Sequence, residues 1–145
     1  MVTADYRCGK IVVAVLDKGN DLQQELERLV LAADIAFCHV SGIGSLDRVR
    51  MTYYDQDVKQ DRDIVLDHPV MLAAMTGTAF ARGDEVAVHA HIVLSEGSGT
   101  AYGGDLSLGC RVFSCQLVLT ELLGPSVGRS QDAGTGLARL TFPDE

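Results

Sequence analysis

The stretch RCGKIVVAVLDKGNDLQQELERLVLAAD, residues 7–34, decides the fold. Its first ten residues are rich in valine and isoleucine, and apolar side chains fall on both faces, which predicts a strand in the centre of a sheet. Gly19 ends this strand, and Asn20 is expected to cap a helix with Gln23 as its capping-box partner. Leucines then recur at helical spacing, so one apolar stripe of this helix is expected to pack on the sheet.

After this helix every segment alternates or runs apolar at strand length. Strands are expected at 35–41, 47–55, 62–66, 70–81, 86–95 and 109–122, and a short last one at 137–142 after a glycine- and serine-containing connection at 126–136. One helix and many strands cannot form repeated strand-helix-strand units. The sequence therefore predicts an α+β fold, a strongly twisted, mostly antiparallel sheet packed with one main helix. We expect a single domain over residues 1–145, with a core at about 6–123 and a short C-terminal extension at 124–145.

Composition limits the classes of protein to which this chain can belong. At 145 residues and 47% apolar content, the chain is long and hydrophobic enough to fold around a core. Twenty acidic against twelve basic residues give a net charge of -8, which repels the phosphate backbone and argues against DNA binding by this chain alone. The positive mean hydropathy of +0.14 indicates apolar surface that a second copy of the chain covers.

Location and redox state follow from simple patterns. The longest apolar runs, 11–16 and 29–33, fall short of the roughly 20 residues that cross a bilayer, and the first residues do not resemble a secretory signal. We therefore expect no membrane partner. The four cysteines form no Cys-x-x-Cys pair and are expected to be reduced and mostly buried. Both observations predict a cytoplasmic protein.

The stretch VHAHIVLS, residues 88–95, is the main clue to function. Alternate residues of a strand face the same side, so His89 and His91 leave one face of the sheet. If the turn at Gly103 and Gly104 brings Asp105 back toward them, two neutral nitrogen donors and one carboxylate meet, which suits zinc or another divalent first-row metal. The alternative is a pair of hydrogen-bonded histidines in a polar groove, with Asp105 as a turn residue that bonds its own backbone.

Other segments offer accessory groups. His39 can supply a third nitrogen donor if its strand neighbours the histidine strand, and Arg50 can contact an acidic substrate or pair with surface acids. The stretch GIGSL, residues 42–46, lacks the third glycine and the following helix of a dinucleotide fingerprint, so no nucleotide cofactor is expected. Instead we interpret it as a glycine-rich bend between two strands. The sequence contains no Gly-x-Ser-x-Gly elbow, and it identifies no catalytic residue.

These motifs together resemble a known family. The segments GIGSL, VHAHIVLS, YGGDL and QLVLTEL, at 42–46, 88–95, 102–106 and 116–122, with the strand at 72–78 and a late Asp132-x-x-Thr135-Gly136-Leu137, come in the order and spacing of the plants and prokaryotes conserved (PPC) domain. The resemblance implies a curved, mostly antiparallel sheet with one main helix that assembles as a homotrimer. Prokaryotic members are commonly labelled DNA-binding proteins with a PD1-like motif. In land plants the domain accompanies AT-hook segments and mediates self-association and partner binding, but this chain has no such hook.

The chain departs from the family pattern at two polar positions. The family usually has Gly-Gly-His-Leu where this chain has Gly103-Gly104-Asp105-Leu106, so a cluster of three histidines becomes two histidines and an acid. Carboxylate is also a zinc ligand, so a metal site can survive this change. The family often has a glutamate where this chain has Met71. These departures indicate an altered or lost activity.

The leading interpretation is a homotrimeric binding or regulatory protein with a polar, metal-binding site on His89, His91 and Asp105, whose partners are its own copies and other proteins. One alternative is an uncharacterised metal-dependent enzyme that uses the same site. The other is a PD1-like DNA-binding protein, which the net charge of -8 and the missing AT-hook disfavour.

Overall fold

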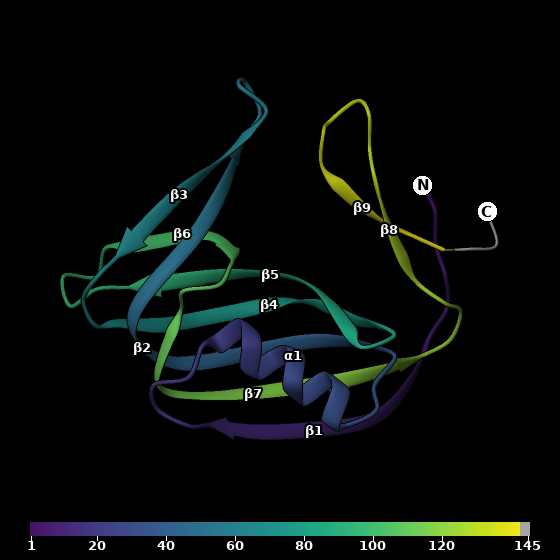
Figure 1. Ribbon diagram of the computed structural model, residues 1–145, viewed down its shortest axis with the longest axis horizontal. Coiled ribbons are helices and arrows are strands. Elements are labelled where there is room, and N and C mark those ends of the chain that lie inside the picture. The colour runs from purple at the N-terminus through teal and green to yellow at the C-terminus, as the bar shows by residue number, and fades with distance from the viewer. Residues whose placement is uncertain (143–145) are drawn as a thin grey trace.

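A computed structural model describes residues 1–142 and shows one large, twisted, antiparallel sheet, one helix and a separate pair of strands (Figure 1). The elements in chain order are β1 (Arg7–Leu16), α1 (Leu22–Ala32), β2 (Phe37–Asp55), β3 (Gln60–Leu66), β4 (Val70–Arg82), β5 (Glu85–Ser95), β6 (Ala101–Leu106), β7 (Arg111–Leu123), β8 (Gly128–Gln131) and β9 (Ala138–Thr141). The expected α+β fold with one main helix is confirmed. Within the described residues, no helix has the length and apolar character needed to cross a membrane.

The long strand β2 organises the sheet. The strand order is β1-β7-β2-β4-β5-β6, and β3 pairs with β2 outside this path. The first part of β2 lies between β4 and β7, whereas its last part pairs with β3 and also with β6. Strands β2, β4, β5 and β6 therefore close a small ring, and β6 is held from both sides.

The sequence predicted that the glycine bend at 42–46 separates two strands, and this prediction was wrong. The pairing of β2 with β4 shifts register between Gly42 and Gly44, so the bend is an irregularity inside one continuous strand. Gly44 has a φ of 151°, and a Cβ there would overlap the backbone of Ser114 and Cys115 on β7. Glycine is needed because β7 passes too close for any side chain.

Helix α1 covers one face of the sheet. Leu22, Leu26 and Val30 are completely buried on that face, as the leucine spacing predicted. The predicted cap was wrong by one residue, because Asp21 and not Asn20 is the N-cap of the helix. Asp21 Oδ1 accepts a hydrogen bond from Gln24 N at 3.1 Å, and its Oδ2 accepts one from Gly109 N at 2.7 Å. This carboxylate therefore caps the helix and ties it to the approach of β7.

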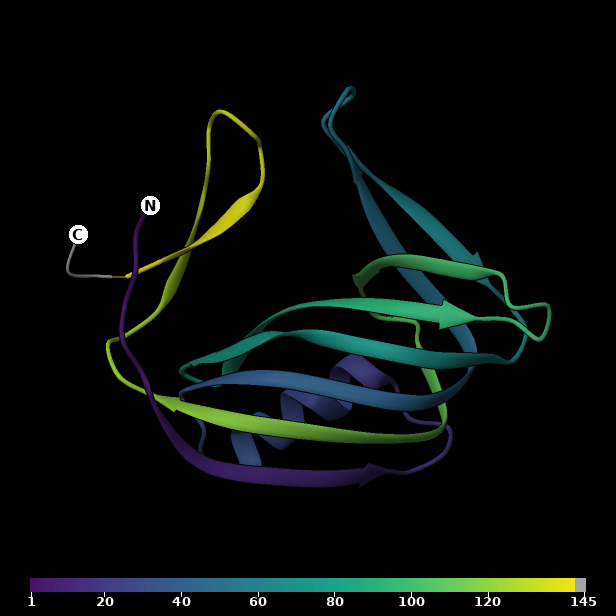
Figure 2. The same ribbon diagram turned by 180° about the vertical axis from the view of Figure 1, so that it is seen from behind.

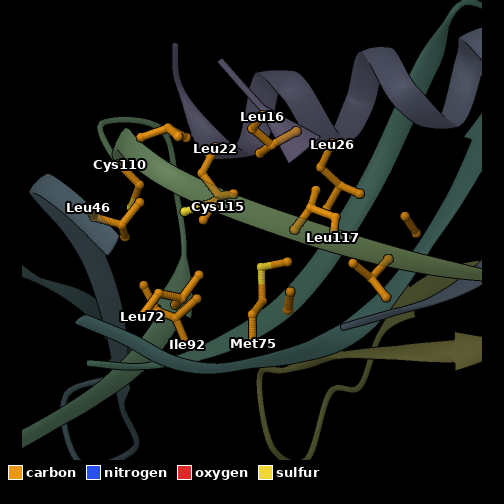
Figure 3. Close-up of a cluster of buried hydrophobic side chains, with 14 of the residues drawn as sticks. Leu16, Leu22, Leu26, Leu46, Leu72, Met75, Ile92, Cys110, Cys115 and Leu117 are labelled. Atoms are coloured by element: carbon orange, nitrogen blue, oxygen red, sulfur yellow. The ribbon is translucent and has the colours of Figure 1, made fainter. Parts of the chain in front are cut away.

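The core lies between α1 and the sheet (Figure 3). Helix leucines meet inward side chains of several strands, among them Leu72, Met75, Ile92 and Leu117, all almost completely buried. Cys38, Cys110 and Cys115 belong to this core, and all four cysteines are free. The expectation of reduced, mostly buried cysteines agrees with this structure; only Cys8 is exposed.

Strand β1 lies at an edge and not in the centre, so this prediction was wrong. Its one neighbour in the sheet is β7, and its outward residues Ile11, Val13 and Val15 are 62%, 69% and 80% exposed. The valine-rich sequence indicated burial on both faces, but α1 covers just one of them within this chain. The outward apolar row is thus unpartnered in a single copy of the described chain.

The end of the chain forms a separate arm. Strands β8 and β9 pair only with each other, so the expected connection at 126–136 contains a strand, and the last strand does not join the main sheet. This arm and the β2–β3 hairpin rise on the same side of the molecule, beyond β5 and β6, both in Figure 1 and in the reverse view of Figure 2. The arm is fixed at its base, where Tyr6 Oη donates a hydrogen bond to Pro125 O at 2.9 Å.

Candidate metal centre

Two neighbouring strands place the three predicted ligands together. In the antiparallel ladder of β5 and β6, His91 lies directly opposite Asp105. His89 is two residues before His91, so its side chain leaves the same face. This face is the one turned away from α1, because the intervening Ala90 and the next residue Ile92 are buried. The sequence treated the two glycines as a turn, but Ala101–Leu106 is a strand and the turn lies before it.

The three side chains converge on one point. Asp105 Oδ1 lies 3.0 Å from His91 Nε2 and 3.4 Å from His89 Nε2. One ligand atom from each residue lies within 4.8 Å of the others, and the imidazole rings are roughly perpendicular with centroids 5.1 Å apart. Asp105 Oδ1 is shielded from solvent and accepts no well-formed hydrogen bond from the described residues. A buried oxygen without a donor, facing two imidazole nitrogens, fits a divalent metal ion.

Glycine at position 104 sets the place of Asp105. Gly104 lies close against β2: a Cβ on it would be 2.8 Å from Thr52 O and 3.1 Å from Met51 Sδ. Without that Cβ, β6 can pair with β2, where Thr52 lies opposite Asp105. Gly103 faces open space by comparison, since its nearest neighbour would be 3.7 Å away.

The site is partly open to solvent. The side chains of His89, His91 and Asp105 are 46%, 64% and 32% exposed. Burial lowers the pKa of His89 below its usual 6.5, and the positive charge of Arg129 lowers it further against the opposing effect of Asp105. A neutral imidazole is the form that binds metal, so His89 is available as a ligand at neutral pH.

Arg129 on β8 is a site residue that the sequence did not reveal. Its Nη2 donates a hydrogen bond to Ala138 O at 3.1 Å, across the β8–β9 arm. Its Nε is shielded from solvent and has no hydrogen-bond partner in residues 1–142. Burial lowers the pKa of Arg129, and the negative charge of Asp105 opposes this shift, so the two charges interact. The one signal in the sequence was the Asp132-Thr135-Gly136 motif, which marks the turn of this arm but indicates no role for Arg129.

The structure does not bring the other candidate residues into this group. His39 lies on the same face, but β4 separates its strand from β5, and its Nε2 is 3.2 Å from Thr76 Oγ1. Arg50 Nη2 pairs with Asp63 at 2.8 Å on the neighbouring strand β3, in the surface ion pair that was one of its two interpretations. The fourth histidine, His68, was not a candidate, and it also lies outside the group, with its Nε2 2.7 Å from Glu96 Oε1.

Comparison with known proteins identifies relatives over nearly the whole chain. The family model of the Plants and Prokaryotes Conserved (PCC) domain matches residues 4–123. A metal-containing protein from Archaeoglobus fulgidus is 28% identical, with a TM-score of 0.89 over 97% of this chain and 99% of that one. A plant- and prokaryote-conserved protein from Pyrococcus horikoshii is 26% identical, with a TM-score of 0.84 over 96% and 97%.

Two further comparisons carry less. A protein from Bacteroides thetaiotaomicron, provisionally described as DNA-binding, has a TM-score of 0.82 over 95% of this chain and 98% of that one, at 16% identity. That likeness shows the fold alone. The bifunctional protein GlmU from a Synechococcus strain is 30% identical over 84% of this chain. The matched part of this chain spans 19% of the length of that curated relative.

Proposed function

Because this chain belongs to the Plants and Prokaryotes Conserved domain family, we propose that it is a self-associating binding or regulatory protein with a metal ion at His89, His91 and Asp105. The observation that carries the proposal is the convergence of two imidazole nitrogens and one carboxylate oxygen on a single point. The relative from Archaeoglobus fulgidus, which is described as metal-containing, supports it.

Zinc is the first candidate for the metal. Two histidine nitrogens and one carboxylate oxygen form a ligand set that zinc accepts, and manganese, iron and cobalt tolerate it as well. Three protein ligands leave at least one coordination position open, and the side chains at this site are partly exposed. The proposed ion therefore serves to hold a ligand at the surface of the protein. A purely structural zinc would have four protein ligands.

The outward apolar face supports self-association as the second part of the proposal. Val15 on β1, Ile43 on β2 and Phe113 on β7 are each at least half exposed. A surface hollow of about 150 Å³ lies between Val15 and Ile43, and a larger one of about 350 Å³ is lined by Met71 and Phe113. Neither hollow includes the histidines. A homotrimer, as the family resemblance implies, would cover this apolar surface and leave the metal site to a ligand.

The elemental metal content of tag-free protein, purified without chelators and measured per chain by mass spectrometry, tests the proposed metal centre. We expect close to one transition-metal ion per chain in the wild type and a background level in the Asp105→Ala variant. The matched control is Asp63→Ala, which removes an exposed carboxylate that pairs with Arg50 and lies outside the group of three ligands. A metal-free wild type that also fails to bind added zinc would contradict the proposal.

The open coordination position favours a second function, a metal-dependent enzyme. An ion with three protein ligands can hold water and lower its pKa, or polarise a carbonyl oxygen of a substrate. Incubation of the metal-loaded protein with a panel of esters, amides and phosphate esters distinguishes the two functions. Turnover that disappears in the Asp105→Ala variant would favour the enzyme, whereas binding without turnover would favour the binding protein.

A further inference from the structure

Arg129 has an unsatisfied charge beside the proposed metal centre. Six of the other eight arginines form ion pairs with carboxylates, but Arg129 has no carboxylate oxygen within 4.0 Å in residues 1–142. One of its nitrogens bonds a backbone carbonyl and another is shielded without a partner. A guanidinium offers five donors, and a shielded donor without an acceptor is costly.

The β8–β9 arm is held in place at its base and near its tip. At its base, the ring of Tyr6 contacts Phe37 and Phe142 with centroid distances of 5.3 and 6.3 Å. Near its tip, Gly136 has a φ of 74°, and a Cβ there would overlap the hydroxyl group of Tyr54 on β2. The arm thus rises from the edge of the sheet and contacts Tyr54 of the β2–β3 hairpin near its tip, and Arg129 belongs to its strand β8. Figure 2 shows the arm and the hairpin as separate ribbons that rise on the same side.

The charges at this place are unbalanced once a metal is present. A divalent ion on two neutral imidazoles and one carboxylate keeps one positive charge, and Arg129 adds a second. The metal ion and the guanidinium of Arg129 would both be near Asp105, and two positive charges repel each other unless a negative group lies between them. Within the described residues, Asp105 is the one carboxylate within 4.0 Å of His89 or His91, and no carboxylate lies within 4.0 Å of Arg129.

We propose that a small oxyanion, a carboxylate or a phosphate, binds here with one oxygen on the open metal position and another on the guanidinium of Arg129. The planar guanidinium fork matches both kinds of anion. This inference rests on the proposed metal centre and names the chemical class of its ligand. Arg129 is the residue that gives the site its preference for anions over neutral ligands.

Protein loaded with Co²⁺ tests the inference, because the visible spectrum of Co²⁺ reports its coordination. Acetate and methyl phosphate are titrated separately, which distinguishes a carboxylate from a phosphate ligand. We expect a saturable spectral change with at least one of them. In the Arg129→Gln variant the dissociation constant should rise about tenfold or more, since a charge-assisted bond is lost, while Co²⁺ still binds one per chain. Arg82→Gln, which removes an exposed charge at the end of β4, is the control and should match the wild type.

The outcomes separate this inference from the metal proposal. A wild type that binds no Co²⁺ would overturn both. A wild type that binds Co²⁺ but responds to neither anion, or an Arg129→Gln variant with unchanged anion affinity, would overturn the role of Arg129 alone. Arg129→Lys keeps the charge without the fork, and it should recover part of the lost affinity. Circular dichroism and thermal unfolding of each variant show that the fold is retained.

Discussion

His91 and Asp105 face each other across the β5–β6 ladder, with 3.0 Å between His91 Nε2 and Asp105 Oδ1. Both residues lie in strands, and β6 is also paired with β2, so backbone register fixes their relation. Ligands on paired strands are held more exactly in place than ligands on loops. Removing one of these side chains should therefore change the site while leaving its surroundings in place.

The His91→Ala variant should lose its metal and keep its fold. The imidazole of His91 is 64% exposed, so its removal should change the free energy of unfolding of the metal-free protein by less than about 0.5 kcal/mol. Metal content should fall to background. His39→Ala is the control, because His39 lies on the same face but outside the group, and it should retain its metal. An unchanged metal content in His91→Ala would exclude this residue as a ligand.

The two adjacent glycines of β6 should respond very differently to substitution. In Gly104→Ala the new methyl group would press on Thr52 O and Met51 Sδ, so we expect a loss of about 1–3 kcal/mol in urea unfolding together with weaker metal binding. In Gly103→Ala the nearest neighbour is 3.7 Å away, so stability should be unchanged or slightly higher. Equal effects of the two variants would show that β6 does not lie against β2 as described.

Replacing Val15 by aspartate should disrupt self-association. Val15 is 80% exposed in the single chain, so Val15→Asp should leave the folded chain stable but place a charge on the apolar face. Sedimentation equilibrium should show a homotrimer for the wild type and smaller species for Val15→Asp. Leu31→Asp alters an exposed leucine on α1, on the other face of the sheet, and it should remain trimeric. A monomeric wild type would refute the proposed assembly.

Only one of the four cysteines should react with iodoacetamide in the native protein. Burial raises the pKa of Cys38 and Cys110 to about 11, and it raises the pKa of Cys115 as well. The thiolate is the reactive form, so these three thiols are protected both by burial and by protonation. Mass spectrometry at pH 8 should show one adduct, on Cys8, and four after denaturation in urea. Rapid labelling of Cys38 in native protein would indicate local opening of the core.

Acid should loosen the β8–β9 arm, because protonation removes the negative charge of Asp132 that holds its turn. Hydrogen bonds from Thr135, with further contributions from Arg139 and Gly134, lower the pKa of Asp132 from 3.8 to about 2. Because the folded pKa is lower than the unfolded one, this carboxylate stabilises the arm above about pH 4, and the stabilisation is lost as the pH falls toward 2. Amide NMR signals of Gly134 and Thr135 should titrate over this range in the wild type and not in Asp132→Asn.

Local patterns in the sequence predicted most elements but not how they meet. The helix followed from leucine spacing, and the strands at 62–66, 70–81, 86–95 and 109–122 were placed within a few residues of β3, β4, β5 and β7. Strand β6 was missed because two adjacent glycines are typical of a turn. In the fold they allow β6 to approach β2, a long-range contact that local propensity does not encode.

For the candidate site, too, the sequence predicted some residues and missed others. Alternation in a strand predicted that His89 and His91 share a face, and the family resemblance indicated the position of Asp105. Arg129 was not found, because it enters through the arm, whose place is set by Tyr6 and by contact with Tyr54. Strand β1 was misplaced for a related reason: an apolar strand covered by another copy of the chain has the same sequence pattern as one buried inside a single copy.

The pairing of β1 with β7 also has a consequence for folding. Arg7 pairs with Leu123, so the first strand of the domain cannot complete its ladder until almost the whole domain has been synthesised. Contacts this distant in sequence slow folding, and an unpaired apolar strand is prone to join other chains in the meantime. During synthesis, β1 is therefore expected to stay unpaired until β7 has emerged, and a chaperone that binds it would limit association with other chains in that interval.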